Sequence, residues 1–319
     1  GYISKTRDLL LTVQTASATG YTSRYANIGK TSNKGVELSI ESRNIVRPKF
    51  SWTTNLTIAH NKQNVDDIGS EDFVTALSSP GNNPYMMYGY VKGYPLNALW
   101  GFKYGGTWKN ADERKENEIT KTYVSVSNTD GGARYYDVNH DGVMSREDLI
   151  YQGNADPYLY GGLQNTFYIH GFKLGVYFAY SLGGKIYNYS EIYMAGSQFA
   201  NQYRYMLDAW HPVRNPNSDI PRAGAKSDAA LPSDFMIHDA SYLRLKNVTL
   251  AYTFDLRKKC SWLRDLTLSV SGENLYLWKK YNGFDPDVSS EGTSSTLRRM
   301  DLGAYPKPRT IIFSIQLRY

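Results

Sequence analysis

Strict alternation of apolar and polar residues, arranged in pairs of runs, is the feature that most limits how this chain can fold. Residues 36–41 alternate in this way, and so do residues 50–59, with only Arg47-Pro48-Lys49 between the two runs. A period of two places successive side chains on opposite faces of a strand. We therefore predict an antiparallel hairpin with one apolar face, one polar face and a tight turn.

The same pattern recurs along the rest of the chain. Two further hairpins are predicted, with short turns at His170-Gly171 and around Arg257, and a single strand is expected at each end. These six strands lie at residues 158–169, 172–182, 242–254, 266–277, 2–12 and 309–319. The last strand places five large apolar side chains on one face, namely Ile311, Phe313, Ile315, Leu317 and Tyr319.

The connections at the two ends of these strands differ in length. All the tight turns lie at one end, and the other end has long connections over residues 16–34, 63–157, 187–239 and 279–306. Outer-membrane barrels have short periplasmic turns, long extracellular loops and an even number of strands. We therefore predict an all-β fold, an antiparallel transmembrane β-barrel with long extracellular loops. The pattern gives eight strands, or ten if a further hairpin lies around residues 88–108.

Composition is consistent with this fold and excludes several others. The mean hydropathy is −0.51, and no apolar run approaches the ~20 residues of a membrane-spanning helix. Barrel strands alternate polar with apolar residues, so their mean hydropathy stays low. A chain with 14% aromatic residues, 28 of them Tyr in 319, is not typical of disorder. One cysteine, Cys260, excludes a disulfide-stapled scaffold.

The chain has no motif that indicates enzymatic chemistry or nucleic-acid binding. Phosphate loops, GxSxG elbows, HExxH helices and CxxC pairs are absent from the sequence. The net charge of +6 comes from basic residues in predicted loops and turns, without a DNA- or RNA-binding signature. We therefore expect no catalysis and no nucleic-acid partner.

One segment has the spacing of a calcium-binding loop. In residues 137–148, oxygen-bearing side chains fall at positions one, three, five, nine and twelve, with glycine at six. The predicted Ca²⁺ ligands are Asp137, Asn139, Asp141, the Val143 carbonyl and Asp148. The flanking sequences are not long amphipathic helices, so a static ion that stiffens a loop is favoured over a sensor. The alternative is an acidic turn without an ion, in which Asp and Asn bond to the local backbone.

Several motifs, in order, resemble the C-terminal barrel portion of SusC/RagA-family TonB-dependent transporters from the outer membrane of Bacteroidota. The resemblance extends over essentially all 319 residues, and each motif is weak alone. The motifs are NKGVEL at 33–38, DVNHDG at 137–142, YGGLQNT at 160–166, SYLRLKNVTL at 241–250, GENL at 272–275, GFDP at 283–286 and YPKPRT at 305–310.

The resemblance implies a much larger protein, with a plugged barrel of about 22 strands. It implies active import of oligosaccharides or peptides, with a SusD-like lipoprotein as lid. TonB-ExbB-ExbD would act through N-terminal parts that this chain lacks, and lipid would surround the wall. Residues 1–319 are then expected to be a fragment, the C-terminal part of the barrel, with 109–157 as a long extracellular loop holding the Ca²⁺ motif.

Two other functions are compatible with the pattern. An even strand count would allow an autonomous small outer-membrane barrel, acting as an adhesin or structural protein. A secreted, Ca²⁺-loaded β-sandwich that binds glycans is a third possibility. The loop aromatics Tyr203, Tyr205 and Trp210 suit stacking on sugar rings, but packing on one another or on a partner protein is the more common role of such side chains.

Overall fold

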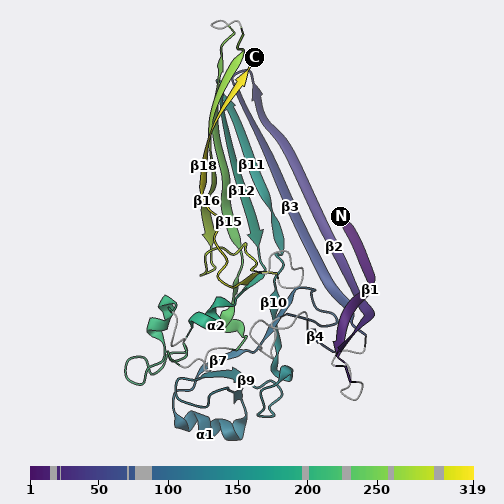
Figure 1. Cartoon of the computed structure of the whole chain (residues 1–319), viewed down its shortest axis with the longest axis vertical. Helices are drawn as coiled ribbons and strands as arrows, with labels where there is room; N and C mark the ends of the chain where they lie inside the picture. The colour runs from purple at the N-terminus through teal and green to yellow at the C-terminus, as the bar shows by residue number, and fades with distance from the viewer. Residues whose placement is uncertain are drawn as a thin grey trace.

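The computed structural model describes residues 1–14, 20–21, 23–69, 72–75, 88–195, 201–224, 231–257, 262–290 and 298–319. Its largest element is an antiparallel sheet of eight strands, which forms a long curved wall (Figure 1). The strands, in sheet order, are β1 (Tyr2–Gln14), β2 (Ser23–Arg47), β3 (Phe50–Asp67), β11 (Leu159–Ile169), β12 (Phe172–Leu182), β15 (Tyr242–Asp255), β16 (Asp265–Lys279) and β18 (Thr310–Arg318).

Each strand of the wall pairs with the next one along the chain, as the hairpin pattern predicts. The turns at 48–49 and 170–171 are as short as expected. The turn after β15 includes Cys260, which lies outside the described residues. Strands β1 and β18 are the two edges, and no pairing joins them among the described residues. The wall is therefore open, and the described residues do not close into an autonomous barrel.

Two strands are longer than the sequence pattern predicts. Strand β2 begins at Ser23, and β3 ends at Asp67, so the connections expected at 16–34 and 63–157 are partly strand. Residues 31–35 of β2 pair with β1 on one side and with the end of β3 on the other. Backbone pairing on both sides satisfies the N–H and C=O groups of this mostly polar stretch, where hydrophobic alternation is weak.

The alternative of ten strands, with an extra hairpin around residues 88–108, is wrong, because that segment is not part of the wall. Its strands belong to small separate sheets. The aromatic side chains Trp100, Phe102 and Trp108 are buried against other loop residues, so they do not alternate between lipid and lumen. The small sheets pair β4 (Val74–Thr75) with β5 (Gly89–Tyr90), β6 (Ala98–Gly101) with β10 (Ile150–Asn154), and β7 (Tyr104–Thr107) with β9 (Ala133–Tyr136) and β8 (Tyr123–Val124).

The two faces of the wall differ in chemistry. On one face, here the apolar face, large hydrophobic side chains are exposed, including Val36 at 60%, Phe313 at 81% and Ile315 at 73%. On the other, the polar face, Glu37, Ala59, Tyr160, Ser181 and Tyr242 lie directly opposite one another across five strands. Large hydrocarbon side chains exposed in this way are unfavourable in water.

Most of the buried core lies in the loops. The long connections gather at one end of the strands as a packed layer, here the loop layer (Figure 1). Leu99, Tyr187, Met236 and Met300 form one buried cluster there, although they come from three different connections. The other elements of the layer are α1 (Ala111–Thr120), η2 (Arg146–Asp148), β13 (Lys185–Asn188), α2 (Ser190–Met194), η3 (Arg204–Asp208), η4 (Asp234–Met236), β14 (Ile237–Asp239) and β17 (Met300–Asp301).

Helices are few and short in this protein. Across the ranges that the structure describes, no helix has the length and apolar character needed to cross a membrane.

Candidate functional site

The predicted calcium loop connects β9 to η2 within the loop layer. Two of its residues adopt left-handed backbone conformations, His140 with φ 59° and Gly142 with φ 80°. Glycine at this position allows the sharp turn without a Cβ clash. The chain thus bends around its own side chains, so that several loop carboxylates turn toward backbone N–H groups.

Asp137 opens the loop, and its carboxylate is buried, with 2% exposure. Its backbone N–H donates to the Thr122 carbonyl at 3.0 Å. Its Oδ2 accepts from the Gly142 N–H at 2.7 Å. Its Oδ1 is buried and has no hydrogen-bond partner. One oxygen of this carboxylate is therefore fixed, and the other is left unsatisfied.

Asn139 and Asp141 lie next to each other in the middle of the loop. Asn139 Nδ2 donates to Asp141 Oδ2 at 3.0 Å and to Glu147 Oε2 at 2.8 Å. Asp141 Oδ1 accepts from the Val143 N–H at 2.6 Å. The structure therefore brings together the side chains of two predicted ligands, whereas Val143 enters these contacts through its backbone N–H.

Asp148, the predicted ligand at position twelve, braces the loop. It is fully buried at 0% exposure. Its Oδ1 accepts from the Val138 N–H and its Oδ2 from the Ser145 N–H, both at 2.9 Å. These bonds cap η2 and tie the two ends of the loop together. Bonding to the backbone is what the ion-free alternative predicts, and in the described ranges no group of three His, Cys, Asp or Glu side chains is gathered to hold a metal.

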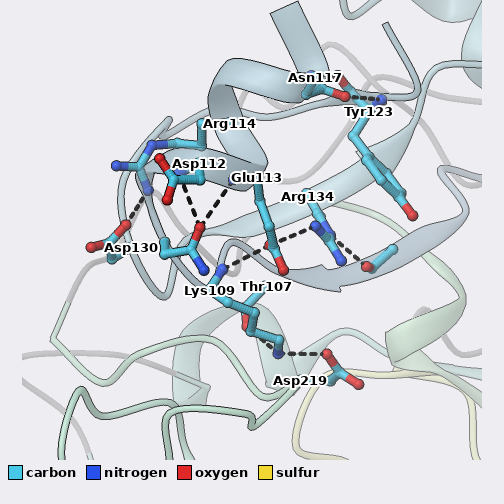
Figure 2. A network of polar contacts seen from close by, with 12 residues as sticks. Thr107, Lys109, Asp112, Glu113, Arg114, Asn117, Tyr123, Asp130, Arg134 and Asp219 are labelled. Carbon is cyan, nitrogen blue, oxygen red and sulfur yellow. Dashed lines mark hydrogen bonds and ion pairs between the residues drawn. The ribbon is translucent and has the colours of Figure 1, made fainter. Parts of the chain in front are cut away.

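Helix α1 packs beside this loop and is held by polar contacts, because none of its side chains is buried. The Asn110 side chain accepts two backbone N–H bonds of the first turn at 3.0 Å each. Glu113 Oε2 accepts from Arg134 Nη1 at 3.0 Å, and the Arg134 guanidinium lies 4.4 Å from the centre of the Tyr123 ring (Figure 2). Further ion pairs join Arg114 to Asp130 and Lys109 to Asp219.

The C-terminal end of α1 is bonded directly to the loop. Lys121, which follows the helix with φ 46°, donates from Nζ to the Asp141 carbonyl at 3.1 Å. The Lys121 carbonyl in turn lies 3.1 Å from His140 Nδ1. The helix and the loop therefore form one substructure. Sequence reasoning missed Lys121 and Ser145 as partners, although the Ser145-x-x-Asp148 capping pattern is readable in the sequence.

A second feature is a cavity of about 980 Å³ on the polar face, where the wall meets the loop layer. Tyr160 and Tyr242 line it, as do Arg298 and Arg299. Arg298 Nη1 pairs with Asp156 Oδ1 at 3.2 Å, and Arg299 Nη2 donates to Ser181 Oγ at 2.8 Å. Both arginines are therefore engaged with the wall or with the loop base.

The loop aromatics pack on protein groups. Tyr203 and Tyr205 stack on each other with ring centres 5.5 Å apart and planes 9° from parallel. Tyr205 also meets Phe235 edge-on at 6.0 Å. Trp210 lies against Gly131, where an added Cβ would meet the indole at 2.4 Å. Of the two roles considered for these side chains, packing is the one that the geometry favours.

No protein-family model matches the chain. It is 32% identical over 329 residues to TonB-dependent receptor P26 of Formosa agariphila, an alignment that takes in all of this chain and 32% of that protein. It is 26% identical to TonB-dependent receptor SusC of Bacteroides thetaiotaomicron, again over the whole chain, with 30% of that protein aligned. Over its whole length the chain is similar to TonB-dependent receptors, SusC among them.

The chain spans about a third of the length of the curated relatives that it matches. Among solved structures it resembles that of the RagAB peptide transporter, with a TM-score of 0.74, 21% identity, and coverage of 99% of this chain and 32% of that one. At this identity the likeness concerns the fold, and it confirms the predicted fold class. The relatives carry the names of receptors and transporters, not of enzymes.

Proposed function

We propose that this chain forms part of the wall and of the extracellular loop layer of a TonB-dependent importer in the outer membrane. The observation that carries the proposal is the open, eight-stranded antiparallel wall with an exposed apolar face and loops packed at one end. Unpaired strand edges are strongly unfavourable in lipid. The edges β1 and β18 therefore need further strands, and the length of the relatives beyond the aligned third could supply them.

The partners follow from the same assignment. Lipid would surround the apolar face. A SusD-like lipoprotein would sit on the loop layer, and TonB-ExbB-ExbD would drive transport through a plug outside this chain. The cargo would be a large nutrient, either an oligosaccharide or a peptide, that passes along the polar face. We expect the chain to perform no chemical step, because its relatives carry the names of receptors and transporters.

The test is to identify the outer-membrane species that contains the tryptic peptide 135–146, which begins after Arg134 and ends at Arg146. We expect a protein several times heavier than 36.2 kDa that co-purifies with a lipoprotein. Deleting its gene should abolish growth on one class of large nutrient and leave growth on the corresponding monomers unchanged. A species of 36.2 kDa without a lipoprotein partner would contradict the proposal.

A further inference from the structure

The loop of residues 137–148 contains a buried carboxylate oxygen that has no hydrogen-bond partner. This oxygen indicates a ligand that the proposed transport function does not explain. Asp137 is 2% exposed, and its Oδ1 makes no hydrogen bond. Leaving a buried charged oxygen unpaired costs free energy, because hydration is lost and nothing replaces it. Among the described residues, the ion pairs around α1 involve Asp112, Glu113, Asp130 and Asp219 and none of the loop's carboxylates. We propose that this loop binds one divalent cation of the Ca²⁺ class.

The available donors select the kind of cation. Besides Asp137, the loop offers the side chains of Asn139 and Asp141, which contact each other at 3.0 Å. All are hard oxygen donors, which suit Ca²⁺ or Mg²⁺. The one histidine of the loop, His140, directs Nδ1 to the Lys121 carbonyl at 3.1 Å. No thiolate is present in the loop, so a zinc or copper site is not indicated.

Asp148 and Asn139 can each offer an oxygen to the ion. Each carboxylate oxygen of Asp148 accepts one backbone N–H bond and keeps a second lone pair. The Asn139 amide directs Nδ2 at Asp141 and Glu147, and its Oδ1 accepts from the Asp141 N–H at 3.3 Å. A half-turn of the amide would give up that 3.3 Å bond and place Oδ1 beside the two carboxylates. Such a site, which combines flexible monodentate ligands with a backbone carbonyl, accommodates Ca²⁺ better than the strict octahedron of Mg²⁺.

The ion would stabilise more than the loop itself. The Thr122 carbonyl accepts from the Asp137 N–H at 3.0 Å, and Lys121 Nζ donates to the Asp141 carbonyl at 3.1 Å. The residues after α1 are thus bonded to two of the ligand-bearing residues. Fixing the loop therefore also fixes the end of α1, which has no buried side chain of its own. The ion has a structural role in the loop layer, and this inference does not depend on transport activity.

The test is amide hydrogen exchange on the full-length receptor purified in detergent, with peptide 135–146 as the reporter. Exchange is compared in EGTA, in CaCl₂ and in MgCl₂. We expect Ca²⁺ to slow exchange of this peptide by about tenfold or more, with a weaker effect of Mg²⁺. D141N should abolish the Ca²⁺ effect. The matched control, D112N, alters a fully exposed carboxylate on α1 and should respond like the parent.

Other outcomes have defined meanings. Ca²⁺-independent exchange of the parent, an unchanged Ca²⁺ response in D141N, or an equal response to Mg²⁺ would overturn the assignment. If D141N fails to assemble, N139D provides the test, because it adds a carboxylate oxygen at position three and should lower the half-saturating Ca²⁺ concentration. No change in that concentration would also count against the site. Loss of the Ca²⁺ response would leave the wall and the size of the outer-membrane species unaffected.

Discussion

Arg244 on β15 and Asp285 in the GFDP segment form a buried ion pair, in which one guanidinium nitrogen lies 2.7 Å and 2.9 Å from the two carboxylate oxygens. The side chains are 5% and 2% exposed. The pair joins the connection that follows β16 to the polar face of the wall. It therefore holds the loop layer and the wall together.

Breaking this pair should release the connection. We expect D285A to destabilise the folded protein by about 3–5 kcal/mol, because the buried Arg244 charge would keep only the more distant Asp287 carboxylate, 3.9 Å away and partly exposed. The measurement is proteinase K cleavage within residues 280–309 on intact cells, which should rise strongly. R257A is the control, since its ion pair with Asp255 is exposed at the opposite end of the strands. Equal protection of D285A and the parent would show that the pair is not a tether.

Tyr281 should make the receptor sensitive to alkali. Its Oη donates to Asp301 Oδ2 at 2.7 Å, and burial, together with that carboxylate, raises the pKa of the phenol well above 10. The folded state thus keeps a proton that the unfolded chain loses above pH 10, so this contribution is present below pH 10 and is lost as the pH rises further.

The comparison is between the parent and Y281F in denaturant unfolding at pH 8 to 11. The parent should lose stability more steeply above about pH 10, with a difference of up to about 1.4 kcal/mol per pH unit for one proton. At neutral pH, Y281F should be the less stable protein by about 1–2 kcal/mol, because Asp301 loses a partner. If the stability of the parent and of Y281F fell equally with pH, the Tyr281 phenol would not be the group that causes the alkaline loss.

The apolar face should tolerate charge poorly in the membrane. Phe313 is 81% exposed on this face, while its neighbour Ser314 is directed to the opposite face. F313R should cost up to about 2–4 kcal/mol, depending on depth in the bilayer, and should reduce the amount of heat-modifiable receptor. S314R is the matched control and should assemble normally. Equal assembly of both variants would argue against lipid contact at Phe313.

Position 161 on β11 requires glycine, because the backbone of the neighbouring strand β3 lies very close to it. A Cβ at this position would lie 2.0 Å from the Thr57 carbonyl oxygen, which also accepts from Tyr180 Oη at 3.0 Å. Because this contact is with backbone, it cannot be relieved by a side-chain rotation. G161A should therefore destabilise the wall by about 1–3 kcal/mol. G175A is the control, since nothing lies within 4 Å of its added Cβ. If G161A and G175A had similar melting temperatures, the close contact between Gly161 and Thr57 would be contradicted.

Local pattern was sufficient to predict the wall. Alternation over 36–41, 50–59 and 310–318 depends on neighbouring residues only, and a register error of one residue would expose the wrong face. The start of β2 at Ser23 was missed, because residues 23–34 are paired by backbone and show little hydrophobic alternation. The spacing of the loop 137–148 likewise indicated its turn, with Gly142 in the left-handed region as expected.

What the sequence alone determined about this protein is its period-two strands, their short turns and the oxygen-rich loop, since each depends on residues close together in the chain. The tertiary structure decided how the long connections fold onto one another. It placed Trp100 and Phe102 in a loop core and paired Arg244 with Asp285. It also directed both oxygens of Asp148 at backbone N–H groups and left Asp137 Oδ1 without a partner. Such burial and pairing depend on contacts between distant segments, which no local spacing encodes.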